Sequence, residues 1–169
     1  MIKDLIINIA ILIAFIFFWH QMFTTRRLTF DSPIWVKAAD GILGGLLGII
    51  LMHFSIYVND ITILDLRHVP VAIVAYYGGI IPPLISAGII SIGRYLIDVN
   101  LSSHVALFMM FIIALGCGLI SYYIKMVNWK KWLLLLFYAQ AIFSIALYIV
   151  APNYSEVVDA AVVHIVFSI

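Results

Sequence analysis

The stretch that decides the fold is YYGGIIPPLISAGIISIGRYLID, which runs from Tyr76 to Asp98 inside an apolar run at 69–97. This run is too long for one ordinary membrane span and too short for two full ones. Gly78-Gly79 followed by Pro82-Pro83 marks a turn, because proline fits the first turn of a new helix and disfavours helix in the residue before it. The residues therefore favour a short broken hairpin at 66–98 that turns near the two prolines; the alternative is one tilted span kinked there.

The composition places this hairpin in a lipid bilayer. Hydrophobic residues make up 66% of the chain, charged residues make up 10%, and the mean hydropathy is +1.19. A soluble domain of this length needs far more charge to cover its surface. Because lipid cannot satisfy backbone hydrogen bonds, the apolar runs predict an all-α, polytopic transmembrane helical bundle. The net charge of +1 and the lack of a basic tract give no indication of a nucleic-acid partner.

Six apolar blocks divide the chain. With the hairpin, they predict six to seven full or partial crossings in one domain over 1–169. We expect 1–23 to be a retained leading span, because no small-residue cleavage site follows it, and 38–169 to form the core. The blocks lie at about 5–23, 38–58, 69–97, 104–124, 132–151 and 156–169.

The distribution of lysine and arginine favours the hairpin over the single span. Short cytoplasmic loops concentrate these residues. With a hairpin, the connectors 24–37 and 125–131 fall on one side, which then holds six of the nine basic residues. A single span divides them four against five, without a real bias. The hairpin therefore predicts an external N-terminus and places whatever follows Ile169 in the cytoplasm.

Under this topology, charged residues gather at the outer ends of several helices. Arg94 and Asp98 are four residues apart on one helical face, and Glu156 and Asp159 are three apart. One interpretation is that Arg67 and Arg94 pair with Asp65 and Asp98 to hold the hairpin together. The other is that these groups line a pocket for a small polar ligand. Tyr76 and Tyr95 are either pocket residues or ordinary packing aromatics. The candidate ligand-binding residues are Asp65, Arg67, His68, Tyr76, Arg94, Tyr95, Asp98, Glu156 and Asp159.

Small residues at helical spacing mark a close packing face in the segment GILGGLLG. This face serves either packing within the chain or a dimer contact. Its residues are Gly41, Gly44, Gly45 and Gly48. The five histidines show no metal-ligand spacing, so we expect no metal site. No catalytic constellation is visible, and the lone Cys117 is expected to be a buried packing residue.

The segment from Asp65 to Asp98 resembles the LytS/YhcK-type multi-span receptor (5TMR) domain of bacterial signalling proteins. The resemblance lies in Asp65 and Arg67 at the start, the Gly78-Gly79 pair in the middle, and Arg94-Tyr95 at the exit. The order of spans and the basic connector extend it over most of the chain. The proline pair and a second arm with little glycine depart from the family pattern, which affects the expected shape of the pocket.

This resemblance implies a sensory domain in the bacterial plasma membrane, with a cytoplasmic output domain after residue 169. The output is implied to be a GGDEF diguanylate cyclase, which works as a homodimer with Mg and GTP, or a LytS-like histidine kinase. No cofactor is expected in this segment. The architecture is similar to the substrate-binding subunits of vitamin importers, so a transport subunit is an alternative function. A third alternative is a membrane anchor that only brings output domains together.

Overall fold

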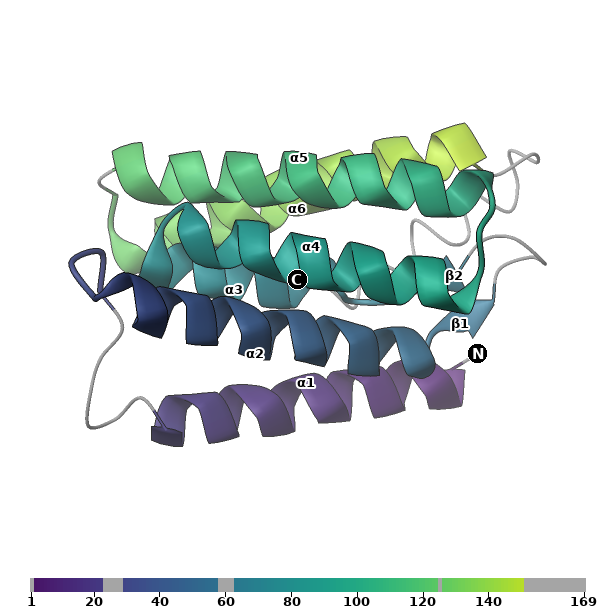
Figure 1. Cartoon of the computed structure of the whole chain (residues 1–169), viewed down its shortest axis with the longest axis horizontal. Coiled ribbons are helices and arrows are strands. Elements are labelled where there is room, and N and C mark those ends of the chain that lie inside the picture. Colours follow the sequence, from purple (N-terminus) through teal and green to yellow (C-terminus); the bar gives the residue numbers. More distant parts are fainter. Residues whose placement is uncertain (1, 23–28, 58–62, 125, 151–169) are drawn as a thin grey trace.

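The computed structural model describes residues 2–22, 29–57, 63–124 and 126–150, which form a bundle of helices (Figure 1). Within these ranges the helices run alternately in opposite directions along one common axis. Two short antiparallel strands, which the sequence did not predict, pair Ile56 with Leu64 and Tyr57 with Ile63. The prediction of an all-α bundle is otherwise confirmed. The elements are α1 (Ile2–Met22), α2 (Ile34–His53), β1 (Ile56–Tyr57), β2 (Ile63–Leu64), α3 (His68–Gly78), α4 (Ile81–Ile97), α5 (Leu101–Tyr123) and α6 (Asn128–Val150).

The helices differ in their ability to cross a bilayer. Three in the described part, α2, α5 and α6, are long and apolar enough to span it, whereas the apolar part of α1 and the whole of α4 are shorter. The 11 residues of α3 rise only about 16 Å. Such a short helix must be surrounded by its neighbours, and α3 is buried along most of its length. The predicted final span at 156–169 lies outside the described residues.

The chain turns back between α3 and α4, as the sequence predicted, but before the prolines. The turn falls at Gly79 and Ile80, where Gly79 has φ +78° and ψ −134°. Pro82 and Pro83 instead occupy the first turn of α4. Proline is tolerated there because first-turn N–H groups have no partner within the helix. Glycine supplies the turn, and the two prolines lie in the first turn of the second arm.

The glycine face of α2 packs against α4 within the same chain. A Cβ at Gly41 would lie 2.7 Å from the carbonyl oxygen of Pro82, and one at Gly45 would lie 2.7 Å from the Cβ of Ile89. Gly44 and Gly48 are also buried. Ser86 Oγ donates a hydrogen bond to the carbonyl oxygen of Gly41 over 2.7 Å. The missing side chains let the two backbones approach closely, which holds the hairpin against α2.

The two ends of the bundle carry different connections (Figure 1). The Gly79 end comprises Thr29–Pro33, Gly79–Ile80, Ile124 and Met126–Val127. The Arg67 end comprises β1, β2, Asp65–Arg67 and Asp98–Asn100. Because α5 begins at the Arg67 end and finishes at the Gly79 end, the connections before α2 and after α5 share one side of the bundle. The hairpin topology requires this arrangement.

Candidate functional site

Charged side chains are buried at the Arg67 end of the bundle. Asp65 and Arg67 lie directly before α3, and Arg94 lies in the last turn of α4; their exposed fractions are 1%, 3% and 3%. The fourth buried charge among the described residues, Asp40, is twelve residues before Met52 on α2, about 18 Å along the helix. Burying a charge is costly unless strong interactions compensate for it. Three buried charges at one end therefore mark a specialised region.

Asp65 fixes the approach of the chain to α3. Its Oδ1 accepts one hydrogen bond from the backbone N–H of Arg67 over 3.0 Å and another from Arg67 Nε over 2.8 Å. Arg67 Nη1 lies 3.2 Å from the sulfur of Met52, which belongs to α2. Arg67 thus connects the start of α3 to the end of α2. The predicted pairing of Arg67 with Asp65 is present in the structure.

Met52 also lies beside the part of α4 that carries Arg94. A Cβ at Gly93 would lie 3.2 Å from the methyl carbon of Met52. His68, the first residue of α3, stacks on Phe143 of α6 at 5.4 Å between ring centroids. Elements α2, α3, α4 and α6 therefore converge at this end. At this end Arg67 is paired with Asp65, and Arg94 supplies a second buried guanidinium group.

Tyr95 and Asp98 organise the connection from α4 to α5. Because α4 ends at Ile97 and Asp98 is extended, Asp98 does not share a helical face with Arg94 as the spacing had predicted. Asp98 Oδ2 accepts a hydrogen bond from Asn100 over 2.6 Å, and Asn100 caps α5. Tyr95 Oη lies 2.7 Å from His104 Nδ1. These contacts make both residues parts of the corner between the helices.

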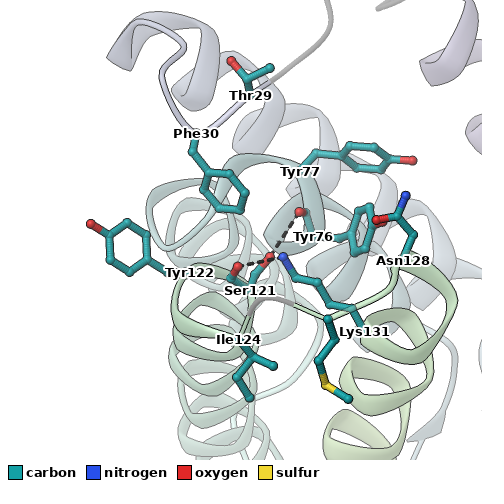
Figure 2. Close-up of a pocket in the computed structure, with 10 residues that line it drawn as sticks. Thr29, Phe30, Tyr76, Tyr77, Ser121, Tyr122, Ile124, Asn128 and Lys131 are labelled. Atoms are coloured by element: carbon teal, nitrogen blue, oxygen red, sulfur yellow. Dashed lines mark hydrogen bonds between the residues drawn. The ribbon is translucent and has the colours of Figure 1, made fainter.

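Tyr76 lies away from the buried charges. It follows Arg67 by nine residues along α3, a rise of about 13 Å, and lines an open cavity at the Gly79 end (Figure 2). The sequence did not predict this cavity. The sequence feature that could have indicated it is the pair Tyr76-Tyr77, which lies on the side where the basic connectors meet. Glu156 and Asp159 lie outside the described residues.

Nothing in the described ranges assembles three metal-ligating side chains. The arrangement at the Arg67 end is instead suited to electrostatic recognition, since guanidinium groups bind carboxylates and phosphates in defined geometries.

Comparison with known proteins identifies the family. Residues 16–168 match the model of the family described as the 5TMR of 5TMR-LYT. The chain belongs to this family. It is therefore a sensor-type domain of a multi-pass membrane protein, and the resemblance in Asp65–Asp98 is confirmed. Most of α1 precedes the matched region of this 5TMR domain.

A curated bacterial protein is similar to most of this chain. The 5TMR domain is 34% identical over 121 residues to the uncharacterized protein YhcK of Bacillus subtilis (strain 168). The aligned part covers 72% of this chain and 33% of the relative. The chain thus spans about a third of the length of the curated relative it matches. No solved structure matches it.

Proposed function

We propose that this 5TMR domain binds a small anionic ligand at the Arg67 end and regulates a C-terminal cytoplasmic output domain. The observation that carries the proposal is the burial of two guanidinium groups, Arg67 and Arg94, from two elements at the same end of the bundle. Guanidinium groups favour an anion such as a carboxylate. Guanidinium groups are suited to this task because they offer several donors in a fixed plane.

We place the Arg67 end on the outer side of the bacterial plasma membrane. The reason is that six of the nine basic residues belong to the connectors or helix starts at the Gly79 end, and cytoplasmic loops concentrate such residues. The N-terminus is then outside, and the chain after residue 169 is in the cytoplasm. The ligand enters from the outer side.

Convergence of several helices at the Arg67 end supports a signalling role. Met52 connects Arg67 to α2, and His68 stacks on Phe143 of α6. An anion that binds these guanidinium groups changes the balance of forces among the helices that carry them. It shifts the protein between two conformations only if it binds them unequally. The helices then transmit the difference towards the cytoplasmic side.

We propose a GGDEF diguanylate cyclase as the output domain, working as a homodimer with Mg and GTP. The aligned part is only 33% of YhcK, which leaves about two thirds of that protein for other domains. A LytS-like histidine kinase is the alternative that the name of the family supports. A transport subunit instead requires uptake that depends on a partner ATPase. The protein sequence after residue 169 separates these three.

The test is the Arg94→Ala variant of the full-length protein. Cyclic di-GMP formation is measured in membranes while small organic acids are added to the outer side. We expect the response of the wild type to be abolished in Arg94→Ala and retained in Lys130→Ala, whose side chain is exposed at the opposite end. Equal amounts of each variant in the membrane show that folding is intact. An unchanged response in Arg94→Ala would exclude the proposed site.

A second experiment distinguishes a receptor from a passive anchor that only brings output domains together. Replacing residues 59–98 with a neutral hairpin removes the buried charges. A receptor then loses its response, whereas a passive anchor keeps its regulation.

A further inference from the structure

An open cavity of about 580 Å³ lies at the Gly79 end, away from the proposed sensory charges (Figure 2). The loop before α2, the end of α3, the end of α5 and the start of α6 all contribute to its walls. A space of this size is typical of small-molecule sites. Four of its ten lining residues are aromatic: Phe30, Tyr76, Tyr77 and Tyr122.

Lys131 is the one charged residue among the ten that line the cavity, and none of the ten is acidic. Its ammonium donates a hydrogen bond to the carbonyl oxygen of Ser121 over 2.7 Å. It also lies 5.2 Å from the ring centroid of Phe30 and 5.4 Å from that of Tyr76. An ammonium has three hydrogens, so those not donated to Ser121 can reach an anion in the cavity.

The aromatic wall is held in place by contacts between helices. Tyr76 stacks on Trp132 at 5.3 Å and meets Tyr77 edge-on at 4.7 Å. Ser121 Oγ donates to the carbonyl oxygen of Tyr76 over 3.1 Å. These contacts connect α3, α5 and α6, so the wall exists before any ligand arrives. Preformed aromatic surfaces bind flat or apolar groups at low entropic cost.

A purely structural role for Lys131 explains less of the geometry. Its hydrogen bond to Ser121 caps the C-terminal turn of α5, where a cation is favourable. That role explains one contact. It does not explain why the ammonium also lies beside two aromatic rings at the edge of an open cavity, whose ten described lining residues include no acid.

We propose that this cavity is a second binding site, for an anionic group carried on an apolar or aromatic body. Lys131 holds the anion, and the rings of Tyr76 and Phe30 hold the body. This site is independent of the ligand proposed at the Arg67 end. Two sources can supply the chemistry: the headgroup of an anionic lipid in the adjacent leaflet, or a soluble organic phosphate.

The test uses the full-length protein in nanodiscs, with thermal unfolding as the readout. One arm titrates phenyl phosphate into phosphatidylcholine nanodiscs, and the other replaces part of the phosphatidylcholine with phosphatidylglycerol. We expect at least one probe to stabilise the wild type. Lys131→Gln should lower the apparent affinity for that probe about tenfold or more, because it removes a charge-assisted contact. Lys130→Gln, the matched neighbour that does not line the cavity, should not weaken it.

A second variant keeps the test decisive if Lys131→Gln does not fold. Asn128 lines the cavity, is exposed and begins α6, where an acidic residue is compatible with the helix. Asn128→Asp should therefore fold and repel the anion. Stabilisation by lipid alone or by phenyl phosphate alone identifies the source. The proposal is overturned if neither probe stabilises the wild type, if Asn128→Asp binds as the wild type does, or if Arg94→Gln is the variant that abolishes the effect.

Discussion

Asp65 and Arg67 form a buried ion pair in which one carboxylate oxygen accepts from both the side chain and the backbone of Arg67, over 2.8 and 3.0 Å. The pair is local in sequence, yet it directs the guanidinium to the sulfur of Met52 on another helix. An ion pair between residues only two positions apart thus places a cation where α2 and α3 meet.

Removing one partner of this pair should be costly. Asp65→Ala leaves Arg67 buried without its carboxylate, and we expect a loss of about 3–5 kcal/mol in the free energy of unfolding. The double variant Asp65→Ala/Arg67→Met should recover part of that loss, because it removes both charges. Denaturant titration in mixed micelles measures the free energy, with Asp31→Ala as the exposed control. A double variant less stable than Asp65→Ala would contradict the assigned pairing.

The glycine face of α2 should tolerate no side chain. Gly41→Ala brings a Cβ against the backbone oxygen of Pro82, which cannot move aside alone, and we expect a loss of about 1–3 kcal/mol. The matched control is Gly88→Ala on α4, where a Cβ meets nothing within 4 Å. That change should be neutral or should stabilise the helix by up to about 1 kcal/mol. Equal stabilities of the two variants would show that α2 and α4 are farther apart than the structure places them.

The turn between α3 and α4 should require glycine at position 79. Its backbone angles are essentially restricted to glycine, so Gly79→Ala should cost about 1–3 kcal/mol. Gly79→Asn should give no rescue, because ψ of −134° is far from the left-handed helical region that asparagine tolerates. The same unfolding titration compares both with Gly88→Ala. If Gly79→Ala is as stable as the wild type, the turn lies elsewhere.

The hairpin makes a topological prediction that a single span does not share. Cysteines introduced at Thr29 and Asn128, in a background with Cys117 replaced by alanine, should be labelled by an impermeant maleimide from the same side. A cysteine at Val99, which is exposed at the Arg67 end, should be labelled from the opposite side. Labelling of Thr29 and Asn128 from opposite sides would restore the single kinked span.

Much of the fold could be predicted from the sequence, because a long apolar run in a bilayer must satisfy its own backbone hydrogen bonds and therefore forms a helix. The hairpin also followed from local chemistry and from the distribution of charge. The position of its turn did not, since both the glycine pair and the proline pair are turn signals. The structure assigns the turn to Gly79 and Ile80, and it places Pro82 and Pro83 in the first turn of α4, which begins at Ile81.

The candidate site could be predicted only in part. The Asp65–Arg67 pairing is local, so spacing was enough to suggest it. The spacing of Arg94 and Asp98 does not show where α4 ends. The sequence therefore allowed Asp98 to lie on the same helical face as Arg94, whereas the helix ends at Ile97. The position of Tyr76 depended on the length of α3. The cavity beside it depended on the packing of three stretches that are distant in sequence, at 29–30, 76–77 and 121–131. Such features require the tertiary structure.

The central claim is that the Arg67 end binds a small anion, and direct binding tests it best. The full-length protein in phosphatidylcholine nanodiscs is titrated with small carboxylates and inorganic phosphate, and thermal unfolding is followed. We predict that at least one anion stabilises the wild type, and that its apparent affinity falls about tenfold or more in Arg94→Gln but is unchanged in Lys131→Gln. Equal stabilisation of Arg94→Gln and the wild type, or no stabilisation of the wild type by any anion tested, would contradict the claim.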